Sequence, residues 1–149
     1  MKILGAILIL TASIFACTVY EKSEKSKIAS AKQICAFIKY IKAQIEYFST
    51  PVGKIFASYG EKTPLIERVC EKDFNMVKKL LDKDDFKLVF EFFEGLGKGL
   101  RVEEAALCSY TIKELEENIA KKEKDYPDKI KVFRAMALFF GFCIVILLI

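Results

Sequence analysis

The chain has 149 residues and a formal net charge of +4, from 24 Lys and Arg against 20 Asp and Glu. A basic excess this small, spread over segments of mixed sign, argues against a nucleic-acid-binding protein. The absence of histidine removes the commonest general base and the commonest neutral metal ligand. We therefore predict no enzyme activity, no cofactor or metal, and no small-molecule substrate.

Five cysteines are spread singly along the sequence, at Cys17, Cys35, Cys70, Cys108 and Cys143. No two have the close spacing of a zinc site or of a dithiol redox motif. Those outside the apolar ends lie at helical spacing among apolar residues. We predict thiols that act as small core residues, which is typical of a reducing compartment.

The first segment is apolar, because residues 3–20 carry no charge. About 18 residues is close to the shortest helix that crosses a bilayer. Tyr20 suits the membrane interface, and Glu21 and Lys22 follow it directly. We predict an N-terminal transmembrane anchor over residues 1–20.

The same segment has a second interpretation as a bacterial lipoprotein signal with cleavage before Cys17. Ile14 and Ala16 fit that pattern, whereas Phe15 is bulky where such signals have a small or β-branched residue. The alternative prediction is a lipid-anchored extracytoplasmic helical protein modified at Cys17.

The central segment, residues 21–131, has the apolar periodicity of several helices. The first stripe repeats at 4-3-4-3 spacing, through Ile34, Ile38, Ile41, Ile45 and Phe48. Two pairs, Thr50-Pro51 and Thr63-Pro64, supply the N-cap and first helical residue of the next helices.

A further helix is expected to begin at a cap formed by Asp84 or Asp85. Its inward-facing residues are expected to be Phe86, Val89, Phe90, Phe93 and Leu96. Gly95, Gly97 and Gly99 then mark a turn between helices. A phosphate-binding loop is excluded there, because the spacing of the glycines and the missing Ser or Thr do not fit.

After Arg101 the apolar stripe predicts one long helix, through Ala105, Cys108, Ile112, Leu115 and Ile119. Ile130 and Phe133 continue the stripe beyond Pro127. We therefore predict that the helix continues through Pro127 with a kink.

The last segment is uncharged over residues 135–149, which span about 22 Å as a helix. With Val132 and Phe133 added, and Arg134 reaching toward headgroups, the length becomes roughly 27 Å. A buried core helix would keep a polar face, and this segment has none. We predict a second transmembrane anchor over residues 132–149.

Basic residues gather on the inner flanks of both apolar ends, at Lys22, Lys25, Lys27, Lys32, Lys121, Lys122, Lys124, Lys129, Lys131 and Arg134. By the positive-inside rule, the central domain lies in the cytoplasm and both termini lie outside. Lys129, Lys131 and Arg134 are expected to contact membrane lipids. The predicted fold is all-α, an antiparallel bundle of about five or six helices flanked by N- and C-terminal transmembrane helices.

Three stretches resemble the stage III sporulation protein AB family of endospore-forming bacteria. Residues 44–51 are similar to its acidic-Ile-x-Tyr-x-x-Thr-Pro signature, with Gln44 in place of the acid. Residues 93–99 are similar to its Leu-Gly-x-Ser/Gly-Asp element, with Leu100 in place of Asp. The last stretch resembles its Tyr-Arg-x-x-Gly-x-x-x-Gly ending through Arg134 and Gly141.

This resemblance implies a membrane-anchored structural component of the channel complex between mother cell and forespore, required for endospore formation. It implies a helical bundle related to the cytoplasmic domain of the type II secretion platform protein, at the cell membrane on the mother-cell side of the forespore envelope. The expected partners are membrane lipids and other stage III sporulation proteins, including the AA ATPase of the same operon. Expected partner contacts are Thr50, Pro51 and the turn with Gly95, Gly97 and Gly99.

Overall fold

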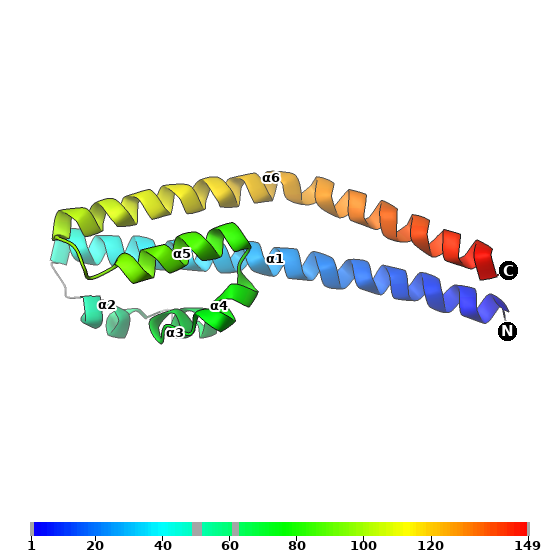
Figure 1. The fold of residues 1–149 in the computed structure, drawn as a ribbon, viewed down its shortest axis with the longest axis horizontal. Coiled ribbons are helices and arrows are strands. Elements are labelled where there is room, and N and C mark those ends of the chain that lie inside the picture. Colours follow the sequence, from blue (N-terminus) through cyan, green and yellow to red (C-terminus); the bar gives the residue numbers. More distant parts are fainter. Residues whose placement is uncertain (1, 49–51, 61–62, 149) are drawn as a thin grey trace. The chain divides into compact units, whose positions relative to one another are not determined.

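The computed structural model describes the backbone of residues 2–48, 52–60 and 63–148. Every regular element in these ranges is a helix. The helices are α1 (Lys2–Phe48), α2 (Val52–Ser58), α3 (Pro64–Cys70), α4 (Phe74–Leu80), α5 (Lys83–Gly95) and α6 (Arg101–Leu148) (Figure 1). The predicted all-α fold of about six helices is confirmed.

The chain forms two compact units. The terminal hairpin comprises Met1–Ser26 and Lys122–Ile149, and the central bundle comprises Lys27–Lys121. Both long helices, α1 with 47 residues and α6 with 48, contribute to each unit.

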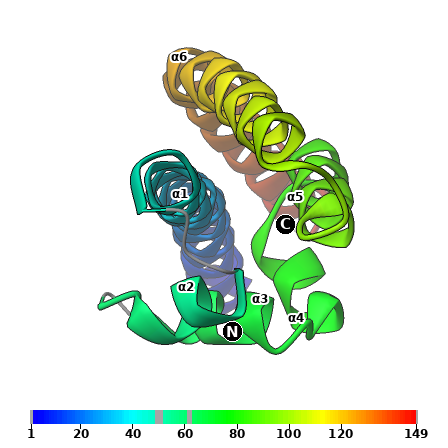
Figure 2. The ribbon, with the colours of Figure 1, turned by 90° about the vertical axis from the view of Figure 1, so that its left-hand side faces the viewer.

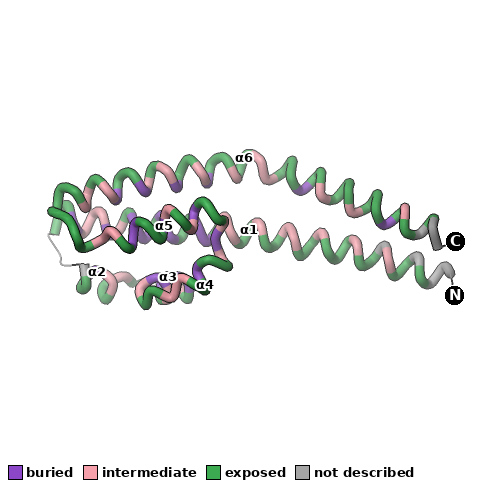
Figure 3. Tube along the Cα trace, in the orientation of Figure 1, coloured by how far each residue is buried: buried purple, intermediate pink, exposed green. Residues whose placement is uncertain are grey.

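The core of the central bundle is built on the second half of α1. The predicted stripe is confirmed over Ile34, Ile38, Ile41 and Ile45, which are all buried. Other helices contribute buried residues to the same cluster: Leu65, Ile66 and Val69 of α3, Val77 of α4, Val89, Phe92 and Phe93 of α5, and Cys108, Leu115 and Ile119 of α6. Within the bundle, α5, α6 and the α2–α4 group surround this interior together with α1 (Figure 2), and buried positions line α1 and α5 (Figure 3).

The buried stripe ends at Ile45, three residues before the predicted last member, Phe48. Phe48, the last residue of α1, is 69% exposed, because the chain leaves the bundle there. The short helices follow their expected start signal where it is described. Thr63 caps α3 by accepting a hydrogen bond from the Ile66 backbone N–H at 3.4 Å, and Pro64 is the first helical residue.

Helix α3 ends in a Schellman motif. The Lys72 backbone N–H donates to Val69 O at 3.1 Å, and that of Asp73 donates to Arg68 O at 2.9 Å. Lys72 has a φ of 59°, the left-handed conformation that glycine usually supplies at this position. The chain therefore reverses quickly between α3 and α4.

The predicted start of α5 was wrong. The N-cap is Asp82, and Asp84 and Asp85 lie in the first turn. The inward face also differs from the predicted one. Phe92 is buried, whereas Phe90, which we expected to face inward, is exposed.

Helix α6 continues through Pro127, as predicted. The kink expected at Pro127 stays a prediction. In the terminal hairpin, Tyr20 stacks on Phe133 with ring centroids 4.2 Å apart, and Glu21 pairs with Arg134. Lys25 lies over the ring of Tyr126, so the contacts run in opposite directions along the two segments, as in an antiparallel pair.

Across the described residues, no helix was found with a stretch both long enough and apolar enough to span a membrane. The assignment of residues 1–20 and 132–149 as transmembrane anchors stays a prediction.

Candidate functional site

The glycine-rich turn joins α5 to α6 at one end of the central bundle. The Leu96 backbone N–H donates to Phe92 O at 3.0 Å, and that of Lys98 donates to Gly95 O at 3.3 Å. Gly97 has a φ of +86°, which only glycine adopts easily. At Gly95 the reason for glycine is packing, because a Cβ would lie 3.2 Å from Leu107 Cδ2.

Glu103 closes the turn at the start of α6. Its Oε2 accepts a hydrogen bond from the Leu100 backbone N–H at 2.9 Å, as the glutamate of a capping box does. A Cβ at Gly99 would lie 2.9 Å from the same oxygen, so a larger residue there would displace the Glu103 side chain. The turn is thereby tied to the first turn of α6.

Arg101 connects the start of α6 to the end of α1. Its Nε donates to Ile45 O at 2.7 Å, and its Nη2 donates to Glu46 O. These carbonyl groups belong to the last turn of α1, where the helix itself offers no donors. A guanidinium group also suits the negative end of the helix dipole. This role was not predicted, because a lone arginine after a turn carries no signal of its distant partner.

Four large apolar side chains are exposed beside this arginine. Tyr47 is 78% exposed and Phe48 69% at the end of α1, while Leu100 is 74% exposed and Val102 79% on either side of Arg101. We call these residues the bundle-end patch. Since Arg101 binds the carbonyl group next to Tyr47, both halves of the patch lie at the same end of the bundle.

The predicted partner-contact residues that the structure describes are the three glycines of the turn, and they lie at this end. Gly97 and Gly99 are exposed in the turn, and Gly95 is half-buried against α6. Thr50 and Pro51 lie outside the described residues. The four residues of the bundle-end patch were not predicted as contact residues, although Tyr47 and Phe48 belong to the stretch that was compared with a family signature.

The three predicted lipid-contact residues lie on α6 in the terminal hairpin. Arg134 Nη2 donates to Glu21 Oε2 at 2.5 Å, and Lys131 forms an ion pair with Asp128 at 3.4 Å. The hydrogen bond from Arg134, followed by that from Lys25, lowers the pKa of the Glu21 carboxyl below its ordinary value.

Lys129 lines an open depression of about 580 Å³ in the same hairpin. Its other lining residues are Tyr20, Asp125, Asp128, Val132, Phe133 and Met136. The polar residues come first along α6 and the apolar ones follow. This order places the depression at the boundary between the charged segment and the uncharged end of the chain.

No group of three acidic or cysteine side chains within the described residues is arranged to hold a metal ion.

The family model described as stage III sporulation protein AB matches the chain over residues 2–72 and 65–149. These ranges together include both compact units and both apolar ends. Neither the curated proteins nor the solved structures contain a significant match to the chain.

Proposed function

The chain belongs to the stage III sporulation protein AB family, and on that basis we propose that it is a non-enzymatic structural component of the channel complex between mother cell and forespore. The observation that carries the proposal is the extent of the family match, which covers residues 2–149. In this role the protein holds partner proteins at a membrane and needs no cofactor.

The membrane part of the proposal rests on the two apolar ends. Residues 3–20 and 135–149 carry no charge. Many of their large apolar side chains are exposed in the terminal hairpin: Ile7, Leu8, Ile14, Phe15, Val19, Met136, Leu138, Phe139, Phe140, Phe142, Ile144 and Ile146. Transfer of such side chains from water to hydrocarbon is favourable by roughly 25 cal/mol per Å². We therefore place both ends in the bilayer and the central bundle in the cytoplasm, on the mother-cell side.

The charged residues next to these ends support the same arrangement. Arg134 and Glu21 pair directly beside the uncharged segments, and pairing reduces the cost of charge close to hydrocarbon. Lys129 and Lys131 are then available to anionic headgroups, at about 1 kcal/mol for each basic residue near the surface.

The bundle-end patch is the surface we propose for a protein partner. Exposed aromatic and aliphatic side chains around a fixed arginine are typical of the centre of a protein–protein interface. The partner is another stage III sporulation protein, and the AA ATPase of the same operon is our first candidate.

Deletion of the coding sequence in its spore-forming host tests the role, and loss of spore formation is expected. Complementation with a Leu100→Asp, Val102→Asp variant should fail, because two charges disrupt the bundle-end patch while Arg101 remains. Tyr110→Asp is the matched control, since Tyr110 is an exposed residue of α6 outside the patch. Normal spores in the deletion strain would overturn the proposed role.

Fractionation and thiol labelling test the location. The full-length protein should sediment with membranes, and an impermeant maleimide should label Cys70 only after the cells are opened. Labelling of Cys70 in intact cells would contradict a cytoplasmic bundle. The intact mass distinguishes the two interpretations of the N-terminal segment. A transmembrane anchor keeps every residue, whereas lipid modification at Cys17 requires loss of the preceding residues.

A further inference from the structure

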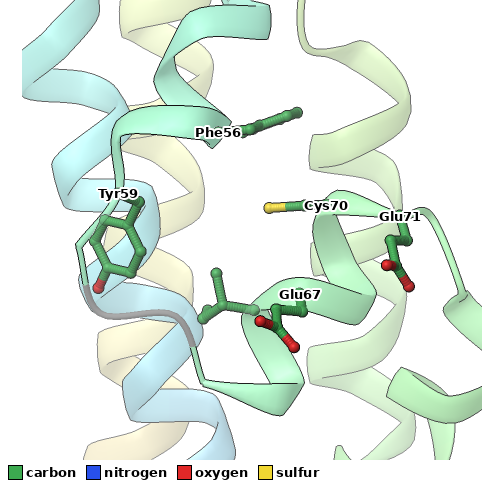
Figure 4. A pocket seen from close by; sticks show the side chains of 6 residues that line it. Phe56, Tyr59, Glu67, Cys70 and Glu71 are labelled. Atoms are coloured by element: carbon green, nitrogen blue, oxygen red, sulfur yellow. The ribbon is translucent and has the colours of Figure 1, made fainter.

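The central bundle contains a pocket between α2 and α3, apart from the bundle-end patch. Its volume is about 340 Å³, which is at the lower end of the range for ligand sites. Six of the described residues line it: Phe56, Tyr59, Ile66, Glu67, Cys70 and Glu71 (Figure 4). Among the described residues, the lining combines two aromatic rings with two carboxylates and contains no basic residue.

The two carboxylates are held on one face of the chain. The Glu71 backbone N–H donates to Glu67 O at 2.9 Å, so the two residues are one helical turn apart and their side chains point in similar directions. Like charges at this spacing repel one another. Glu71 is also the C-cap of α3, where the helix dipole disfavours a negative charge.

The nearest basic residue on α3 does not neutralise them. Arg68 turns to Asp73, with its Nη1 3.2 Å from Asp73 Oδ2. Among the described residues, neither Glu67 nor Glu71 forms a salt bridge, and both are exposed. The two carboxylates therefore give the pocket negative charge that no salt bridge within the described residues offsets.

The aromatic walls are fixed by the core. Phe37, which is fully buried, lies 5.9 Å from Phe56 and 4.7 Å from Tyr59 between ring centroids. In Figure 4 the Cys70 sulfur points into the space near Phe56, Tyr59 and Glu67. A ligand in this space would meet rigid aromatic surfaces, carboxylates and a thiol.

We propose that this pocket binds the guanidinium group of an arginine on an extended segment of a partner protein. A guanidinium group is planar, remains charged at any physiological pH, and presents a fork of donors that can reach more than one carboxylate. Its flat face also stacks on aromatic rings, which the ammonium group of lysine does less well. A metal ion fits poorly, since calcium takes six or more oxygen ligands and the pocket offers two carboxylates. The inference does not depend on the family role or on the bundle-end patch.

The test measures binding of the peptide acetyl-Gly-Arg-Gly-amide to the full-length protein in detergent micelles, by isothermal titration calorimetry. The control peptide has citrulline in place of arginine, which keeps the shape and removes the charge. We expect the arginine peptide to bind at least tenfold more tightly than the citrulline peptide. Equal affinities, or no binding of the arginine peptide, would overturn the proposal.

Two double variants distinguish binding in the pocket from general attraction between the peptide and the acidic residues of the protein. Glu67→Gln with Glu71→Gln should weaken binding at least tenfold. Glu91→Gln with Glu117→Gln removes the same charge from α5 and α6 and should leave binding unchanged, because both residues lie on exposed helix faces with lysine partners. Equal loss in both double variants would show attraction to the whole protein and contradict a defined pocket.

The alkylation rate of Cys70, which lines the pocket, tests binding there without either double variant. Saturating arginine peptide should slow alkylation of Cys70 several-fold, measured by mass spectrometry of the digested protein. The citrulline peptide at the same concentration should have little effect. An unchanged rate with bound arginine peptide would place the binding elsewhere and reject this site.

Discussion

Asp85 is a buried carboxylate in a protein whose other described acidic side chains are partly or fully exposed. It is 1% exposed, and its Oδ1 accepts a hydrogen bond from Asn118 Nδ2 at 3.1 Å, which joins α5 to α6. The sequence suggested a solvated cap at this position. The N-cap is Asp82, so Asp85 is a residue of the helix itself, and it lies on the face that contacts α6.

Asp85→Ala should lower the free energy of unfolding by about 1–3 kcal/mol, because a buried group then loses its hydrogen-bond partner. Asp84→Ala is the control, since Asp84 lies in the same helical turn and is exposed. Its effect should stay within about 0.5 kcal/mol. Urea unfolding followed by circular dichroism measures both, and equal effects would show that only the helix dipole matters.

Cys108 should be the least reactive of the thiols in the central bundle. Its side chain is fully buried, and desolvation raises its pKa to about 11. The thiolate form therefore makes up about 0.1% at pH 8, and only the thiolate attacks an alkylating agent. We expect the rate at Cys108 to rise with pH up to about pH 10 and to remain below that at Cys70. Site-resolved mass spectrometry tests this, and a plateau near pH 8.5 would contradict it.

At the scale of elements, Arg101 joins the start of α6 to the last turn of α1 at the end of the bundle. The two hydrogen bonds to Ile45 O and Glu46 O come from one planar group, so a lysine cannot reproduce them. Arg101→Ala should lower the free energy of unfolding by about 1.5–3 kcal/mol. Arg101→Lys should lower it by less, because lysine keeps the charge but not the planar pair of donors. Thermal unfolding in detergent measures this, and full recovery by lysine would indicate that charge alone is sufficient.

Helices were predictable where the residues themselves carry the signal. The 4-3-4-3 stripe of α1, the Thr63-Pro64 start of α3 and the glycine-rich turn all depend on local chemistry, and the described structure contains each of them. The phase of α5 was not predictable in the same way. Three aspartates follow Leu81 within four positions, and each is a suitable cap, so tertiary packing of Phe92 decided between them.

The candidate sites were less predictable, because they combine residues that are distant in sequence. Arg101 meets Ile45 across more than half of the bundle sequence, and the pocket joins Phe56 to Glu71 through two helices. Glycine spacing indicated the turn at the bundle end. Nothing in the spacing of Tyr47, Phe48, Leu100 and Val102 indicated that these residues share one end.

For the molecule as a whole, the ion pair of the terminal hairpin predicts a dependence on pH. The pKa of Glu21 is lowered in the folded state, chiefly by its hydrogen bond to Arg134. A lowered carboxyl pKa stabilises the fold above the unfolded value, near 4.5, and this contribution disappears as pH falls through the lower folded value.

Glu21→Gln should therefore lower the melting temperature slightly at pH 7 and have a smaller effect at pH 3, because the stabilisation decreases as the pH falls below the unfolded value. Glu24→Gln is the control for a neighbouring glutamate. Melting followed by circular dichroism in detergent, at both pH values, measures the difference. A larger effect of Glu21→Gln at pH 3 than at pH 7 would show that the sign is wrong.

The predicted boundaries at residues 20 and 132 separate the segments expected in the bilayer from the central domain. The boundaries between the two compact units lie elsewhere, near residues 26 and 122. Contacts and membrane depth are different properties, so one division does not replace the other. The continuity of α1 and α6 was only partly predictable: the apolar stripe carried α6 through Pro127, but the first apolar segment and the first bundle helix had no visible link.

The left-handed residue after α3 has an effect beyond the shape of its loop. With Lys72 at a φ of 59°, the chain brings Asp73 back to Arg68, whose guanidinium group is then occupied. A β-branched residue at position 72 would disfavour that reversal and release Arg68 toward the glutamates of its own helix. One backbone torsion outside the walls of the pocket thus helps to hold Arg68 on Asp73 and away from the two glutamates.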